Sequence, residues 1–250
     1  MIIAVDIGNT NFKLGIFSDD DIPVFYKSVS VFEIVNNNAV FDNIVSCIRM
    51  FLNNRSVEKM VVSSVNQSGN FRANEISEVF TSSECHYISA DMNMPFINNY
   101  DNPSQLGSDR IADMAAVRSF YSGNAIIINS GTALVISVLF GNSFEGGVII
   151  PGVQLMIDSL TKNTVLIKNT SLLTNCRLLG RSTEEAVSFG IMNSIIFTVN
   201  AYIEKIRDEY NSDFKIFITG GNGKIISDNI DFENTYLKYL TLQGIKTLFN

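Results

Sequence analysis

Residues 2–17 read IIAVDIGNTNFKLGIF, and this stretch decides the fold class. An apolar run leads to an acid at Asp6, a glycine at Gly8 permits a tight turn, and a second apolar run ends at Phe17. We therefore expect two buried strands joined as a hairpin. Because no basic region precedes the first run and the run soon meets Asp6, we do not expect a signal peptide.

A second copy of this pattern begins 123 residues further on, where residues 125–140 read AIIINSGTALVISVLF. The shift places Asp6 on Asn129 and Gly8 on Gly131. A third candidate strand and then segments with helical spacing follow each copy. Because the shift is close to half of the 250 residues, the repeat predicts two similar α/β lobes that face each other across a cleft. We expect the boundaries of these lobes at residues 1–118 and 119–250.

Local patterns predict the remaining elements. We expect the third strands at Ile22–Ser28 and Gly147–Ile150, further strands at Lys59–Ser64, Lys215–Thr219 and Tyr239–Leu242, helices at Phe41–Leu52, Asp109–Ser122 and Thr183–Arg207, and a polar connection at Lys162–Asn175. Ser108 is the expected N-cap of the helix that begins at Asp109, and Thr183 is the expected cap of the long helix.

Composition excludes several classes of protein. With 46% hydrophobic residues the chain has enough apolar material for a full core, so it is not disordered throughout. The net charge of −7, without any block of Lys and Arg, argues against nucleic-acid binding. The longest apolar runs fall well short of the ~18 residues of a membrane span.

The cysteines and the single histidine indicate no nucleophilic or zinc site. Cys47, Cys85 and Cys176 are scattered and form no CxxC motif, which favours a reduced, cytosolic protein. His86 adjoins Cys85, and neighbouring residues of a strand point to opposite faces of the sheet. A Cys-His pair is therefore not expected, and no GxSxG motif supports a serine triad.

The first chemical constellation is the turn Asp6–Thr10 with Lys13 behind it. A carboxylate at the end of a buried strand needs a partner, and Mg²⁺ is usually held by one or two carboxylates together with substrate phosphates. Gly8 permits a turn whose backbone N–H groups bind an anion, and Lys13 adds a positive charge for phosphate. An ordinary Asp/Asn-Gly hairpin turn is the simpler alternative.

The second constellation is Tyr100 followed by Leu106–Arg110, of sequence LGSDR. Asp109 falls in the first turn of a predicted helix, whose dipole favours a carboxylate by ~0.3–1 kcal/mol and keeps it ionised. An ionised carboxylate suits a base that takes a proton from a hydroxyl, and Arg110 suits neutralisation of phosphate charge. A capped helix with a surface arginine is the alternative.

Two glycine turns in the second half complete the pattern. Ser130–Ala133 is the repeat's counterpart of the first turn, and Thr219–Gly221 follows a predicted buried strand. Such a glycine turn lets a flat nucleotide approach bare backbone, although Gly-Gly turns are common. Taken together, the four segments resemble the actin/hexokinase/heat-shock-protein ATPase superfamily. That resemblance implies two related ribonuclease H-like lobes around a central cleft.

Within this superfamily the chain resembles the type III pantothenate kinases. The segments that carry the resemblance are DIGNTNFK near the start, Tyr100 before LGSDR, SGTA, GGVIIPG at Gly146–Gly152, TGGNG and YLTLQGIKTL, and they span essentially the whole chain in order. The resemblance implies ATP-dependent phosphorylation of the pantothenate hydroxyl, the first step toward coenzyme A. It also implies a cytoplasmic homodimer that uses Mg²⁺ and a monovalent cation, K⁺ or NH₄⁺.

By position, the resemblance assigns roles to individual residues. Asp6, Ile7, Gly8, Asn9, Thr10, Asn11, Phe12, Lys13 and Thr132 would bind ATP and its phosphates, Asp6 would hold Mg²⁺ through water, and Tyr100, Gly107, Ser108, Asp109, Arg110 and Thr183 would bind pantothenate. Asp109 would be the general base. ATP and pantothenate are then the partners, with no nucleic acid and no membrane.

The chain departs from the family pattern in its second turn. That pattern has an acid, a Thr pair and a further acid at the places held here by Asn129, Leu134, Val135 and Ser137. Asn129 occupies the family's monovalent-cation position and offers an uncharged oxygen in place of a carboxylate. Two alternatives therefore stay open, a non-catalytic paralogue that binds nucleotide or pantothenate, and a kinase of the superfamily that acts on another small hydroxyl substrate.

Overall fold

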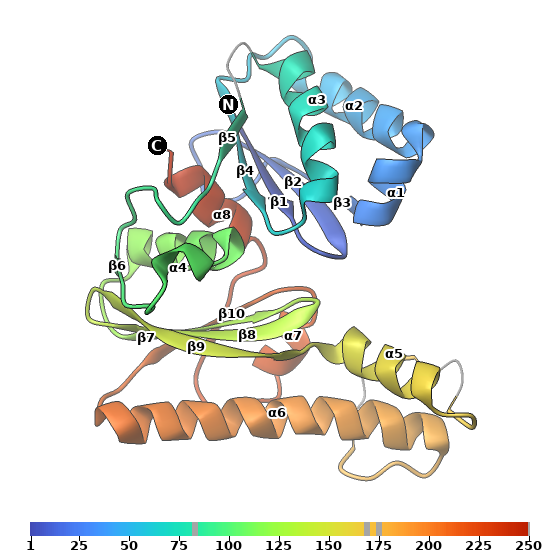
Figure 1. The fold of residues 1–250 in the computed structure, drawn as a ribbon, viewed down its shortest axis with the longest axis vertical. Helices are drawn as coiled ribbons and strands as arrows, with labels where there is room; N and C mark the ends of the chain where they lie inside the picture. Colours follow the sequence, from blue (N-terminus) through green and yellow to red (C-terminus); the bar gives the residue numbers. More distant parts are fainter. Residues whose placement is uncertain (82–84, 168–170, 174–176, 250) are drawn as a thin grey trace. The chain divides into compact units, whose positions relative to one another are not determined.

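The computed structural model describes residues 1–81, 85–167, 171–173 and 177–249. The chain divides into two compact units (Figure 1). Unit 1 comprises Met1–Ser122, Asn142–Phe144 and Tyr239–Asn250, and unit 2 comprises Gly123–Gly141 and Glu145–Lys238. The C-terminal residues thus belong to unit 1, whereas the repeat alone assigned them to the second lobe.

Unit 1 is built on a five-stranded sheet with the order β3-β2-β1-β4-β5. Its strands are β1 Ile2–Ile7, β2 Asn11–Phe17, β3 Phe25–Ser30, β4 Lys59–Ser64 and β5 Cys85–Tyr87. β1 and β2 form the predicted antiparallel hairpin, whereas β4 runs parallel to β1. All six residues of β1 are buried, as a central strand covered on both faces requires.

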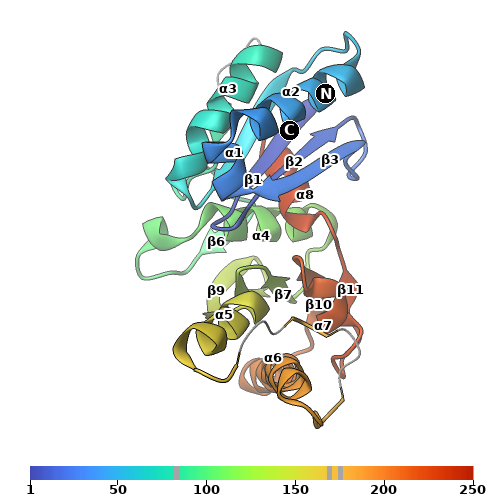
Figure 2. The same ribbon diagram turned by 90° about the vertical axis from the view of Figure 1, so that its right-hand side faces the viewer.

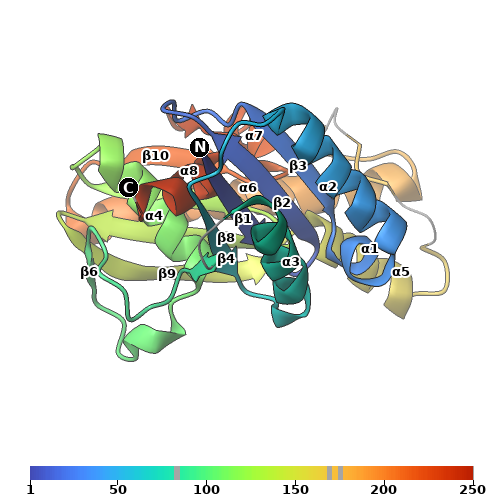
Figure 3. The same cartoon turned by 90° about the horizontal axis from the view of Figure 1, so that it is seen from above.

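Helices cover both faces of this sheet. On one face lie α1 Val31–Asn36, α2 Asn38–Leu52 and α3 Asn70–Phe80 (Figures 1 and 3), and they share a core with alternate residues of β1. On the other face lie α4 Ser108–Phe120 and α8 Leu240–Thr247, which contact each other. Between α3 and α4 run the short strand β6 Ile97–Asn98 and the 3-10 turn Pro103–Gln105.

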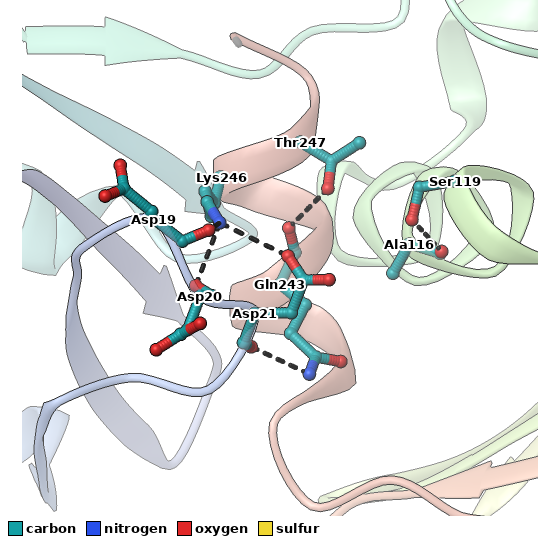
Figure 4. A network of polar contacts seen from close by, with 8 residues as sticks. All are labelled: Asp19, Asp20, Asp21, Ala116, Ser119, Gln243, Lys246 and Thr247. Atoms are coloured by element: carbon teal, nitrogen blue, oxygen red, sulfur yellow. Dashed lines mark hydrogen bonds and ion pairs between the residues drawn. The ribbon is translucent and has the colours of Figure 1, made fainter.

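The helix α8 replaces the strand predicted at Tyr239–Leu242, and that prediction was wrong. Its Gly244 lies so close to α4 that a Cβ there would come within 1.7 Å of the Ala112 carbonyl oxygen. The ammonium group of Lys246 is buried and donates to the carbonyl oxygens of Asp19 and Asp20 at 3.1 and 2.9 Å (Figure 4). Close backbone packing and this lysine fix α8 on unit 1, which short-range periodicity does not reveal.

Unit 2 repeats the topology of unit 1. Its strands are β7 Ala125–Ser130, β8 Ala133–Phe140, β9 Ser143–Pro151, β10 Lys215–Thr219 and β11 Thr235–Tyr236. The first two residues of β9, Ser143 and Phe144, belong to unit 1. They follow the order β11-β10-β7-β8-β9, with β7 antiparallel to β8 and parallel to β10. The correspondence of β1–β5 with β7–β11 confirms the predicted fold class, a duplicated α/β unit.

The two hairpins differ by one residue in their turns. In the first, Asp6 pairs with Lys13, and in the second Asn129 pairs with Val135. A shift of 123 residues would have placed Ile136 at that position. The second hairpin is therefore one residue tighter, and no lysine stands opposite Asn129.

The helices of unit 2 are α5 Val153–Asn163, α6 Thr183–Tyr210 and α7 Gly223–Ser227 (Figure 2). The helix α6 is long and apolar enough to span a membrane, but half of its most apolar stretch is buried inside the protein. Buried residues such as Met192, Ile195 and Val199 place it in the same core cluster as Ile128 and Ile218 of the sheet. The helix thus has the burial of a core helix.

Several boundaries differ from the predicted ones. Ser182, not Thr183, caps α6, because its hydroxyl accepts from the Glu185 N–H at 3.2 Å. Gly107 occupies the N-cap position of α4, so the prediction for Ser108 was also wrong. The predicted connection at Lys162–Asn175 begins inside α5, and parts of it, like Cys176, lie outside the described residues.

Candidate functional site

Asp6 and Lys13 form an ion pair at the end of the first hairpin. The Lys13 Nζ donates to Asp6 Oδ2 at 3.0 Å, and the two side chains are 31% and 7% exposed. The strand register places the residues directly opposite each other. The Asp6 charge raises the pKa of Lys13, while burial opposes that rise. The buried carboxylate therefore has a charged partner before any ligand is present.

The turn between these strands carries the predicted phosphate-binding residues. The Gly8 N–H donates to the Asn11 carbonyl oxygen at 3.0 Å, so this group serves the turn itself. Asn9, Thr10 and Asn11 are exposed. The side chains of Ile7 and Phe12 lie in the core, so only their backbone is available to a ligand.

The start of α4 holds the predicted base, Asp109. Asp109 Oδ1 accepts from the Arg110 N–H at 2.8 Å, an interaction expected of a carboxylate in a first helical turn. A Cβ at Gly107 would lie 2.7 Å from the same oxygen, so glycine is needed for the carboxylate to take this position. The Ser108 hydroxyl lies 3.0 Å from that of Ser63 on β4 and fixes the helix start to the sheet.

The electrostatics of Asp109 differ from those of a surface acid. Burial raises its pKa, and the nearby negative charge of Asp6 raises it further. The Arg110 N–H and guanidinium act in the opposite direction. A carboxylate with a raised pKa binds a proton more tightly than an ordinary aspartate, which improves it as a general base as long as it stays ionised.

Arg110 lies against two aromatic rings. Its side chain is buried, its Nη1 donates to the Tyr100 hydroxyl, and its guanidinium carbon lies 5.3 and 5.0 Å from the ring centroids of Tyr100 and Phe144. The structure thus brings together Tyr100 and Arg110, both of which were predicted to bind pantothenate. It adds Phe144, which carries no motif and was not predicted.

A buried acid on α4 was also missed. Asp113 lies one helical turn after Asp109, and its Oδ1 accepts from the Thr241 hydroxyl of α8 at 2.6 Å. Its charge contributes to the raised pKa of Lys13. The four-residue spacing from Asp109 was the available signal, because i and i+4 share a helix face.

In unit 2, the second turn is assembled from three glycine segments. The Gly131 N–H donates to the Ala133 carbonyl at 3.0 Å, and the Gly152 N–H donates to that of Thr132 at 3.0 Å. A Cβ at Gly152 would lie 2.5 Å from the carbonyl oxygens of Gly131 and Thr132. Gly220 has a φ of +95°, and a Cβ there would lie 2.4 Å from the Ser130 carbonyl oxygen. The SGTA, GGVIIPG and TGG motifs therefore meet in one place within unit 2.

Asn129 and Thr183 are the other predicted site residues of unit 2. The Asn129 Oδ1 lies near Gly131, 3.8 Å from where a Cβ would stand. Thr183 is exposed and lines an apolar groove of about 410 Å³ with residues of α5 and α6, among them Met156, Leu160 and Ile191. Thr183 lies in unit 2, and Tyr100 and Arg110 lie in unit 1.

The donor set of unit 1 fits Mg²⁺ only with substrate oxygens added. Among the described residues, no group of three or more His, Cys, Asp or Glu side chains is gathered for a metal. Asp6 is a buried carboxylate at the end of a strand, and Mg²⁺ characteristically uses one or two carboxylates together with phosphates and water. A divalent ion that arrives with ATP is therefore compatible with this site.

His86 has the structural role expected from its position in the strand. Its ring stacks on Phe249 at 5.5 Å, and it stands on β5 next to Cys85, whose pKa burial raises to about 11. A thiol with so high a pKa is not a ready nucleophile.

Solved structures of other proteins share this fold. A protein described as a 2-dehydro-3-deoxygalactonokinase from Sinorhizobium meliloti has a TM-score of 0.60 at 10% identity and covers 100% of this chain and 96% of its own. An activator of the 2-hydroxyisocaproyl-CoA dehydratase from Clostridium difficile, solved with bound ADPNP, has a TM-score of 0.55 at 13% identity and covers 99% and 93%. These likenesses show the fold alone, which is the two-lobed, actin-like architecture.

Sequence comparison then narrows the class to one family. The type III pantothenate kinase family model matches residues 2–205. A type III pantothenate kinase from Sulfurihydrogenibium sp. is 31% identical over 251 residues, which cover 98% of this chain and 98% of that relative. This chain belongs to the type III pantothenate kinase family.

Proposed function

We propose that this chain transfers the γ-phosphoryl group of ATP to the hydroxyl of pantothenate and so makes 4'-phosphopantothenate for coenzyme A synthesis. Family membership supports this activity. The observation that carries it is Asp109, a half-buried carboxylate at a helix start with a raised pKa, beside Arg110. Nothing in the comparisons favours a non-catalytic paralogue.

Asp109 acts on the acceptor hydroxyl. It takes the proton as the oxygen attacks the γ-phosphorus, and its raised pKa makes this transfer more favourable than it would be for a surface aspartate. Gly107, Ser108, Arg110, Tyr100 and Thr183 bind pantothenate. Because phosphoryl transfer needs positioning and charge neutralisation more than covalent chemistry, these residues contribute mainly by orientation.

The turn from Asp6 to Lys13 binds the phosphates of ATP, and Thr132 of the second turn also contacts the nucleotide. Lys13 supplies positive charge, and Asn9 and Thr10 supply polar side chains on the exposed part of the turn. On nucleotide binding, the Lys13 ammonium is shared between Asp6 and a phosphate oxygen. Asp6 is held ready by this lysine for a metal that arrives with the nucleotide.

Two ions belong to the proposal. Asp6 would hold Mg²⁺ through water, together with phosphate oxygens of the substrate, and the ion would offset the phosphate charge. Asn129 stands at the position that would hold a monovalent cation, K⁺ or NH₄⁺. Because Asn129 offers only a neutral amide oxygen there, we infer that the ion binds more weakly than at a carboxylate.

The remaining expectations rest on the family resemblance and the sequence composition. We propose that the protein acts in the cytoplasm as a homodimer, with ATP and pantothenate as its ligands and with neither nucleic acid nor membrane as a partner. The net charge of −7 and the absence of a Lys/Arg block support the exclusion of nucleic acid.

The decisive experiment measures ADP release by the purified chain with and without pantothenate, at several K⁺ and NH₄⁺ concentrations. We expect pantothenate-dependent turnover that Asp109→Asn lowers by about 10²–10⁴-fold, as for loss of a general base. Asp101→Asn, which neutralises an exposed acid of the same unit, is the matched control and should keep its rate. If ADP release never depends on pantothenate at any salt tested, the proposed function is wrong.

A further inference from the structure

The guanidinium of Arg110 rests against a pair of aromatic rings in unit 1. Tyr100 and Phe144 have ring centroids 4.9 Å apart at an interplanar angle of 51°. The Arg110 guanidinium carbon lies 5.0 Å from the Phe144 centroid and 5.3 Å from that of Tyr100. Both distances are within the ~6 Å range in which a cation is attracted to a ring face.

Strand pairing brings these residues together from distant parts of the sequence. β6 runs parallel to the start of β9, so that Asn98 pairs with Phe144, and the Asn99 N–H donates to the Phe144 carbonyl at 3.1 Å. Tyr100 follows directly, and its N–H donates to the Asn98 Oδ1 at 3.1 Å. The backbone thus fixes the positions of both rings independently of the Arg110 side chain.

The arrangement restricts how Arg110 can point. A guanidinium is flat and carries its N–H groups in its own plane, so its orientation decides how it can meet a planar acceptor such as a carboxylate. Arg110 is only 6% exposed, Phe144 is fully buried, and one N–H of Arg110 is already given to the Tyr100 hydroxyl. Few rotamers of such a long side chain fit this space. The entropy cost of ordering the Arg110 side chain is therefore met on folding, before substrate binds.

We propose that Phe144 is a positioning residue for acceptor binding, and that its ring holds the Arg110 guanidinium in the orientation that binds the carboxylate of pantothenate. This inference rests on the proposed function, since it deepens the role given there to Arg110. Phe144 touches Arg110 and Tyr100, and it acts on the substrate through them. No sequence motif marks this position.

The test is steady-state kinetics of Phe144→Leu, which keeps the site apolar but removes the ring face. Loss of a desolvated cation–ring contact predicts a rise of about five- to thirty-fold in the KM for pantothenate. The KM for ATP and kcat should stay within about threefold, because binding of the acceptor rather than the transition state is affected. Phe144→Met, which is unbranched and also apolar, serves as a second variant with the same expectation.

Phe17→Leu is the matched control. Phe17 is also fully buried in unit 1 and also has a cation over its ring, the Lys246 ammonium at 5.7 Å. It lies at the end of β2 and takes no part in the proposed site. This variant should lose stability as Phe144→Leu does, but its KM for pantothenate should not change.

A double-mutant cycle separates positioning from a general packing effect. If Phe144 acts through the guanidinium, Phe144→Leu should raise the KM little in an Arg110→Lys background, because the planar group that it orients is gone. Equal effects in both backgrounds would overturn the inference. It would also be overturned if the KM of Phe144→Leu matched that of the control, or if neither Phe144 variant folded while Phe17→Leu did.

These outcomes are distinct from failure of the proposed function. The wild-type chain is assayed first, and absence of pantothenate-dependent turnover there would contradict the activity itself. Turnover in the wild type with unchanged kinetics in Phe144→Leu would leave the activity standing and reject only the role of Phe144.

Discussion

Lys13 Nζ and Asp6 Oδ2 lie 3.0 Å apart on the two strands of the first hairpin. Asp6 is nearly fully buried, and the Lys13 charge is the partner that makes this burial tolerable. The same two residues are the proposed contacts of metal and phosphate. We therefore expect the stability of unit 1 and the affinity for ATP to depend on this one pair of side chains.

Replacing the lysine should affect both properties. We expect Lys13→Met to lower the free energy of unfolding by about 1–3 kcal/mol, because it leaves a buried carboxylate unpaired. This range is below that of a fully buried ion pair because solvent screens the partly exposed lysine. The KM for ATP should rise by roughly tenfold for loss of a charged phosphate contact. Urea unfolding and ATP titrations measure the two effects.

A surface ion pair supplies the control. On α6, Lys205 Nζ lies 3.6 Å from Asp208 Oδ2, and both side chains are mostly exposed. Lys205→Met should change the free energy of unfolding by less than about 0.5 kcal/mol and leave the KM for ATP unchanged. If Lys13→Met were as harmless as this control, the Asp6–Lys13 pair would have no special role.

Asp109→Asn should make the protein more stable as well as inactive. Burial and the Asp6 charge raise the Asp109 pKa in the folded chain, so ionising this group costs stability. At a pH below 3.8, the pKa of this carboxyl in the unfolded chain, the group is protonated in both the folded and the unfolded chain, and it costs no stability. As the pH rises from there through the raised folded pKa, wild type loses stability, and it stays lower at neutral pH.

The measurement is urea unfolding of wild type and Asp109→Asn at pH 7 and near pH 4. We expect the variant to be the more stable at pH 7, with a smaller difference at the lower pH. The activity of wild type should also fall on acidification at a higher pH than for an ordinary aspartate. A variant less stable than wild type at pH 7 would contradict the raised pKa.

Gly107→Ala should displace the Asp109 carboxylate. A Cβ at Gly107 would stand 2.7 Å from Asp109 Oδ1, well inside contact distance. We expect kcat to fall by about tenfold or more for a small misplacement of the base. Gln105→Ala, at an exposed neighbouring position, should keep the wild-type rate, and equal rates for both variants would remove the stated reason for this glycine.

The sequence predicted the strands better than the connections around them. Lys59–Ser64 and Lys215–Thr219 were predicted with the observed bounds, because continuous apolar runs between turns define central strands. The C-terminal segment was predicted as a strand but is α8. Its position depends on Gly244 meeting Ala112 and on Lys246 meeting the loop at Asp19, which are contacts across more than a hundred residues.

The site residues were likewise predicted where a short motif marks them and missed where only distant contacts bring them together. Asp6, Lys13, Asp109 and Arg110 stand in short motifs, and the structure places all four in unit 1. Phe144 was missed because it joins Arg110 only through the pairing of β6 with β9. Such a residue has no local pattern, so topology is needed to find it.

The close contact of α8 with α4 gives a stability prediction. Gly244→Ala would bring a Cβ within 1.7 Å of the Ala112 carbonyl oxygen, so α8 must shift on unit 1. We expect a loss of about 3 kcal/mol or more in the free energy of unfolding, the upper range for overpacking. Thr247→Ala, at a half-buried position of the same helix, should cost no more than about 1 kcal/mol. Equal losses would contradict close packing as the cause.

Asn129→Asp should strengthen the response to monovalent cations. A carboxylate at this place adds a full negative charge beside the second glycine turn, where Asn129 offers only a neutral oxygen. The measurement is pantothenate-dependent turnover against KCl concentration, with ionic strength held constant by choline chloride. We expect half-maximal activation of the variant at a KCl concentration lower than that of wild type by about tenfold.

The matched control is Asn163→Asp, which adds the same charge at an exposed position of α5. If the added charge acted only through the general electrostatic field of unit 2, both variants would shift the KCl dependence by the same amount. Screening at the ionic strength of the assay would make that shared shift small. A shift confined to Asn129→Asp would locate the cation at the second turn. Full activity of wild type without any K⁺ or NH₄⁺, unchanged in the variant, would instead show that this chain works without the ion, and the proposed cation site would be rejected.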